Sequence, residues 1–138
     1  MQEVNINGMI NAPADEVWKV ISDFGALNTF VEAVVKCTTD GSEAGAIRTL
    51  TLQDGGEVKE RLLSLDNKKR ILKYTISESP MPIENYEGKM EVKNLSDTKS
   101  EFIWSSTFEA AEGTEQDMKK ALSGLYSLGV EGLKKKFA

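Results

Sequence analysis

The chain has 138 residues, 40% of them hydrophobic, and its 22 acidic and 17 basic side chains give a formal net charge of −5. This length and composition suit one hydrophobic core, so we expect residues 1–138 to form a single domain. The basic side chains are scattered among acidic ones, which argues against a nucleic-acid-binding protein because phosphate contacts require clustered lysine and arginine.

The composition also excludes several kinds of site. The chain has no histidine and a single cysteine, Cys37, so Ser-His-Asp and Cys-His catalysis, zinc sites and internal disulfides are excluded. We therefore expect no metal and no cofactor. The apolar runs fall short of the ~20 residues of a membrane helix, and the N-terminus lacks an export pattern, so we expect a cytoplasmic protein without a membrane-spanning segment.

The beginning of the chain predicts one strand and two short helices. Residues 5–10 alternate polar and apolar side chains, as a half-buried strand does. In the segment NAPADEVWKVISDF, Pro13 and two acidic residues suit a first helical turn, and apolar residues then recur at spacings of three and four. We expect an amphipathic helix of about three turns up to Phe24. Gly25 interrupts the pattern, and residues 27–30 indicate a second, very short helix.

From about Val31 to Glu109 the hydrophobic period changes to two. The turn signals TDGSEAG, QDGGE, SLDNKK, SPMPI and NLSDTKS recur about every ten residues, which predicts six strands joined by hairpins. One sheet face is expected to be apolar, with the inward residues Leu72, Tyr74, Ile76, Tyr86, Gly88, Met90, Val92, Phe102, Trp104 and Phe108. Small residues on this face, Gly88 and Ser106, predict unfilled volume.

The end of the chain, from Thr114 to Phe137, predicts one long helix. Its apolar stripe comprises Met118, Leu122, Leu125, Tyr126, Gly129, Val130 and Leu133. Packing this stripe on the apolar face of an antiparallel sheet buries both surfaces. The sequence therefore predicts an α+β fold in which the sheet curls around the last helix.

Two segments resemble a known family. APADEVWKVISDFGAL resembles the opening signature of the Bet v 1-like or START-related (SRPBCC) superfamily. IRTLTLQDGGEVKERLLSLDNKKRILKYTISESPMPIENYEGKMEV is similar to the middle of its polyketide cyclase/dehydrase branch, which includes the plant abscisic acid receptors. The resemblance covers nearly the whole chain. It implies a helix-grip fold: a seven-stranded antiparallel sheet wrapped around a long C-terminal helix, two short helices after the first strand, and a ligand cavity inside.

The resemblance further implies that two hairpin loops close the cavity. The gate loop is matched by residues 53–57, with Asp54, Gly55 and Gly56, and the latch loop by Met81, Pro82 and Ile83. Glycine leaves the gate loop mobile, whereas proline limits the conformations of the latch loop. The alternative is that the prolines merely end a strand and Met81 caps the core.

Three pocket residues follow from the same match: Glu60, Tyr74 and Tyr86. A carboxylate and two phenols in an apolar cavity would orient the polar end of a ligand. Leu122 and Tyr126 of the last helix complete the candidate set. The alternative for Glu60 is a surface position, paired with Arg61 or a neighbouring lysine.

Two functions are compatible with these residues. The first is a non-enzymatic binder or carrier of a small hydrophobic ligand, such as a lipid, isoprenoid or polyketide-like compound. The alternative is a cyclase-, dehydratase- or hydrolase-like enzyme without histidine or metal, in which a buried Glu60 is the general acid or base and Tyr74 or Tyr86 donates a hydrogen bond. Beyond that alternative no catalytic residue is assigned. A module whose gate loop signals ligand occupancy to a protein partner is a third possibility.

Overall fold

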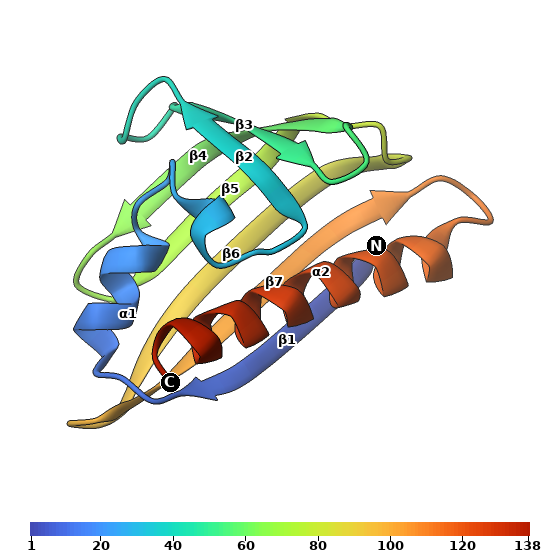
Figure 1. The fold of residues 1–138 in the computed structure, drawn as a ribbon. Coiled ribbons are helices and arrows are strands. Elements are labelled where there is room, and N and C mark those ends of the chain that lie inside the picture. The colour runs from blue at the N-terminus through green and yellow to red at the C-terminus, as the bar shows by residue number, and fades with distance from the viewer.

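The computed structural model describes all residues, 1–138, as a curled sheet with one long and two short helices (Figure 1). The strands are β1 (Gln2–Ile10), β2 (Val34–Thr39), β3 (Ile47–Leu52), β4 (Glu57–Asp66), β5 (Ile71–Glu78), β6 (Ile83–Ser96) and β7 (Lys99–Ala110). The helices are α1 (Ala14–Ile21), the short 3-10 helix η1 (Leu27–Thr29) and α2 (Glu115–Lys136). The predicted α+β helix-grip fold is confirmed.

The seven strands form one antiparallel sheet in the order β1-β7-β6-β5-β4-β3-β2. Strands β2 to β7 pair with their chain neighbours, as hairpins do, while β1 pairs with β7 at the far edge. Figure 1 shows α2 lying over β1 and β7, while the opposite edge, with β2 and β3, curls over towards it.

Helix α1 is shorter than the sequence predicted. Two acidic residues occupy its first turn, as expected, but Pro13 lies just before that turn, at the N-cap position, and the helix has only 8 residues and ends at Ile21. The carboxylate of Asp23 accepts a hydrogen bond from the Gly25 backbone N–H, and such a local turn competes with the helix. Phe24 consequently lies in the following loop, where it is still 1% exposed.

Helix α2 approaches the rest of the chain closely only in its C-terminal half. A Cβ atom on Gly129 would lie 2.6 Å from the Trp104 ring, and one on Gly132 would overlap the backbone carbonyl of Phe30. In the N-terminal half, Leu125 is only partly buried. The closest backbone approaches of α2 are therefore at Gly129 and Gly132, although Leu122 in its N-terminal half is also buried. Neither α1 nor α2 combines the length and the apolar character that crossing a membrane requires.

Substitutions at two glycines of α2 test this close approach. Gly132→Ala should lower the melting temperature, because the new Cβ must displace the Phe30 backbone and overpacking costs about 1–3 kcal/mol. Gly124→Ala is the matched control: its Cβ meets nothing within 4 Å, so it should stabilise the helix by up to about 1 kcal/mol. Equal melting temperatures for the two variants would contradict the packing described.

Candidate functional site

The space between α2 and the sheet is an apolar cavity of about 370 Å³. It is lined by 18 residues, 15 of them hydrophobic. The strands contribute Leu50, Leu52, Val58 and Ile76, and the helix contributes Ala121, Leu122 and Leu125. The cavity exists because α2 packs on β1 and β7, while the curled part of the sheet from β2 to β5 forms the wall on the other side of the cavity.

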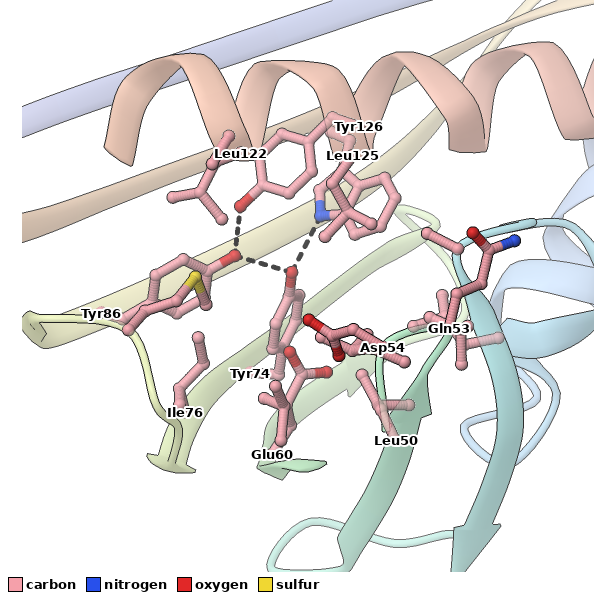
Figure 2. Close-up of a pocket in the computed structure, with 18 residues that line it drawn as sticks. Leu50, Gln53, Asp54, Glu60, Tyr74, Ile76, Tyr86, Leu122, Leu125 and Tyr126 are labelled. Carbon is pink, nitrogen blue, oxygen red and sulfur yellow. Dashed lines mark hydrogen bonds between the residues drawn. The ribbon is translucent and has the colours of Figure 1, made fainter. Parts of the chain in front are cut away.

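A chain of hydrogen bonds runs across the cavity wall (Figure 2). The Trp104 indole N–H lies 2.8 Å from the Tyr74 hydroxyl, which lies 2.9 Å from the Tyr86 hydroxyl. Tyr86 is bonded in turn to the Tyr126 hydroxyl, and Tyr126 donates to Ser106 Oγ at 2.9 Å. The chain joins β5, β6, β7 and α2.

The direction of every bond in this chain is fixed by its two ends. An indole N–H can only donate, and Tyr126 uses its single proton for Ser106. Tyr86 must therefore donate to Tyr126, and Tyr74 must donate to Tyr86. All three phenol protons are thus consumed inside the protein.

An irregularity in β6 places Tyr86. The β6–β7 register shifts between Glu84 and Glu87, and Asn85 has a φ of 52°, a left-handed conformation that asparagine tolerates better than most residues. The Thr75 hydroxyl donates to the Tyr86 carbonyl at 2.6 Å. Such a bulge bends the strand and re-aims its side chains, and here it leaves the Tyr86 ring facing Tyr126.

A buried ion pair lies beside the tyrosines. Glu60 Oε1 accepts a hydrogen bond from Arg48 Nε at 2.8 Å and lies 2.7 Å from Nη2. Arg48 is 1% exposed, its Nη1 donates to the Phe24 carbonyl at 3.3 Å, and its guanidinium stacks between the Phe24 and Tyr74 rings. Both contacts use Oε1, so Oε2 of Glu60 has no hydrogen-bond partner in the protein, and Glu60 is one of the residues that line the cavity.

Burial shifts the pKa values of these groups. Desolvation raises the pKa of Glu60, and the neighbouring Arg48 guanidinium opposes that rise. Burial also raises the pKa values of Tyr74 and Tyr86 well above their usual range and that of Tyr126 to about 12. The phenols are therefore neutral throughout the physiological pH range.

Seven of the predicted site residues line this one cavity: Asp54, Glu60, Tyr74, Met81, Tyr86, Leu122 and Tyr126. The remaining loop residues do not. Gly55 forms the tip of the exposed gate loop, with a φ of 88°, and Gly56 donates its N–H to Asp54 Oδ1. Pro82 and Ile83 line a separate pocket on the surface next to Met81.

The prediction that the small side chains of Gly88 and Ser106 leave the unfilled volume of the cavity was wrong. A Cβ on Gly88 would overlap the Tyr74 ring, so this ring fills the space that the glycine leaves. Ser106 is the acceptor for Tyr126. Neither residue lines the cavity, and the small side chains serve the packing and bonding of the tyrosines instead.

Sequence reasoning missed Arg48, which it could have found by strand alternation. Arg48 has the same parity as Leu50 and therefore faces inward, and it lies directly opposite Glu60 in the β3–β4 register. Glu60 has the same parity as Val58 and Leu62, which also face inward. The surface alternative for Glu60 does not hold, since Glu60 is 6% exposed and its partner is Arg48 rather than Arg61.

Comparisons with known proteins agree with the fold. The model of a family described as "polyketide cyclase / dehydrase and lipid transport" matches residues 1–138. The structure of XoxI from Bacillus cereus is 27% identical in sequence, with a TM-score of 0.92 over 99% of this chain and 96% of that chain. Norcoclaurine synthase from Thalictrum flavum is 18% identical, with a TM-score of 0.79 over 97% and 91%, a likeness of fold alone. No curated protein matches the sequence significantly.

Alkaline titration tests the buried tyrosine chain, because the three tyrosines in it are the only ones in the protein. Burial favours the neutral form of each phenol in the folded protein. The stability that this preference contributes is fully present below pH 10, and it is lost as pH rises through the pKa of the phenol in the folded protein, which is about 12 for Tyr126. Above pH 10 the stability should fall by up to about 1.4 kcal/mol per pH unit for each tyrosine.

The measurement is tyrosinate absorbance recorded together with circular dichroism. In the native protein both signals should change together, well above pH 10, whereas the chain unfolded in urea should titrate near pH 10. Tyrosinate forming near pH 10 in a protein that keeps its native dichroism would show that the hydroxyls are accessible.

Proposed function

Because the chain belongs to the polyketide cyclase/dehydrase and lipid transport family, we propose that it binds or carries a small hydrophobic molecule in the cavity beside α2. The observation that carries this proposal is the cavity itself, with about 370 Å³ of space and 15 hydrophobic residues among the 18 that line it. Ligand pockets in proteins typically measure ~300–1,000 Å³. Lipids, isoprenoids and polyketide-like compounds are the classes that suit such a lining.

The driving force is the removal of apolar surface from water. Each Å² of apolar surface that a ligand buries contributes roughly 25 cal/mol. The cavity walls also gain contacts, since the atoms around an unfilled space lack van der Waals partners on one side. A ligand of matching size therefore stabilises the folded protein by mass action.

We further propose that the gate loop (53–57) and the latch loop (81–83) close the mouth of the cavity. Gln53 and Asp54 of the gate loop and Met81 of the latch loop line the cavity, so both loops contribute side chains to it. The positive φ of Gly55 suits glycine, whose backbone is the most flexible. The latch loop is held by Pro82 and by the Met81 N–H, which donates to Ser79 Oγ at 3.0 Å. Closure would thus come from movement of the gate loop towards a stiffer latch loop.

Catalysis in the same cavity is the alternative, favoured by the burial of Glu60. Desolvation raises its pKa, which moves a carboxyl group towards the range useful for general acid or base catalysis. The tyrosines would not donate hydrogen bonds in such a reaction, because their protons are engaged. Mass spectrometry of the compound released after incubation separates the two functions, since a carrier returns it unchanged.

Titration with the fluorescent probe N-phenylnaphthylamine tests the proposed function. Saturable binding is expected for the native protein, and Ala121→Trp should abolish it because Ala121 lies at the exposed end of the cavity lining. Ser127→Trp is the control, an equally exposed position of α2 outside the cavity, and should bind as the original chain does. Equal binding by both tryptophan variants would place the probe elsewhere.

Single substitutions in the latch loop test its role. Met81→Ser should weaken probe binding by at most about 1.5–3 kcal/mol, the value of burying one such side chain, with a smaller change in unliganded stability. Ile83→Ser, outside the cavity lining, should leave the affinity nearly unchanged. If Met81→Ser instead lowers only the melting temperature of the unliganded protein, Met81 is a core residue and no latch exists.

A further inference from the structure

We infer that the cavity selects apolar molecules whose polar end carries a hydrogen-bond donor, such as an alcohol, a phenol or an amine, over molecules that end in a carboxylate or an ether. This inference rests on the proposed function and specifies the class of ligand. It follows from a count of which protons and lone pairs remain available in the cavity.

The tyrosines offer only lone pairs. The proton of each phenol is donated along the chain that ends at Ser106, as the bond directions require. Each phenol oxygen accepts one hydrogen bond, from Trp104, Tyr74 or Tyr86, and has room for a second. A ligand that meets these hydroxyls therefore meets acceptors.

Glu60 also offers an acceptor. Its Oε1 is engaged by Arg48, and Oε2 has no hydrogen bond to the protein. Arginine stays protonated at any physiological pH, so a protonated Glu60 would leave the buried guanidinium without its counter-ion. The carboxylate beside Tyr74 (Figure 2) is thus an acceptor with a full negative charge.

No side chain of the lining offers a free donor or a positive charge deep in the cavity. The lining includes the carboxylates of Asp54 and Glu60 but neither lysine nor arginine, and Arg48, which is 1% exposed, is not a lining residue. The Trp104 N–H is bonded to Tyr74. The amide of Gln53, at the exposed rim, donates to the Glu32 carbonyl at 3.3 Å.

The free energy of binding therefore differs between ligands that end in a hydrogen-bond donor, an ether oxygen or a carboxylate. A donor can bond to Oε2 or to a phenol oxygen, and bonds to charged groups are the stronger kind. An ether oxygen finds no donor and loses its bond to water on entry. A carboxylate loses its hydration and faces Glu60 and Asp54, charges of the same sign.

Two matched pairs of ligands test the inference by displacement of N-phenylnaphthylamine from the full chain at neutral pH. Decanol should displace the probe at a concentration about tenfold or more below that of its methyl ether, although the ether is the more apolar compound. Decylamine should likewise outcompete decanoate. Equal displacement within each pair overturns the inference and leaves the proposed function standing, whereas failure of every compound and of the probe to bind overturns both.

The variant Ser106→Ala tests the same inference by changing the protein instead of the ligand. Removing the last acceptor of the chain frees one phenol proton, so the advantage of decanol over its methyl ether should shrink several-fold. Ser105→Ala, at the neighbouring β7 position on the opposite face of the sheet, should keep the original ratio. Tyr126→Phe releases the Tyr86 proton and should lower the advantage of decanol as Ser106→Ala does. If one of these two variants fails to fold, the other still tests the inference. An unchanged ratio in a folded variant overturns the inference.

Discussion

The rest of the structure depends on the hydrogen bonds that Tyr126 makes across the interior. Its hydroxyl is bonded to Tyr86 of β6 and to Ser106 of β7, and it is the one polar link by which α2 reaches the buried face of the sheet. A buried hydroxyl without a partner costs ~1–3 kcal/mol, so helix, β6 and β7 must keep their relative positions. Together with the close packing at Gly129, these hydrogen bonds hold α2 in its position over the sheet beside the cavity.

Glycine makes the aromatic cluster around that link possible. Gly88 lies opposite Tyr74 in the β5–β6 register, and the absence of a Cβ there lets the Tyr74 ring cross β6 towards Tyr86 and Trp104. Gly129 does the same for Trp104 on the helix side, and the Trp104 ring stacks on that of Tyr126 with centroids 4.3 Å apart. Large aromatic side chains and glycines thus occupy facing positions and form one packed layer.

The sequence predicted what depends on the periodicity of side chains and missed one contact set by strand register and one helix end set by a local turn. Alternation identified Tyr74, Tyr86 and Trp104 as inward-facing, because side-chain direction in a strand follows from position alone. The contact of Arg48 with Glu60 depends on the β3–β4 register, which a hairpin of uncertain length does not determine. The end of α1 was missed for a different reason, because a local turn at Asp23 outweighed the helical spacing.

The buried ion pair places a charged carboxylate among the mainly hydrophobic residues that line the cavity. Removing one partner of such a pair costs ~3–5 kcal/mol, whereas replacing both by apolar residues is often neutral or stabilising. The net stability that Arg48 and Glu60 contribute to the fold is therefore small. Their contacts instead hold the Glu60 carboxylate with Oε1 engaged and Oε2 facing an otherwise apolar space. Since the Arg48 guanidinium lies over the ring of Tyr74, the ion pair and the tyrosine chain are in contact and form one continuous polar surface beside the apolar part of the cavity.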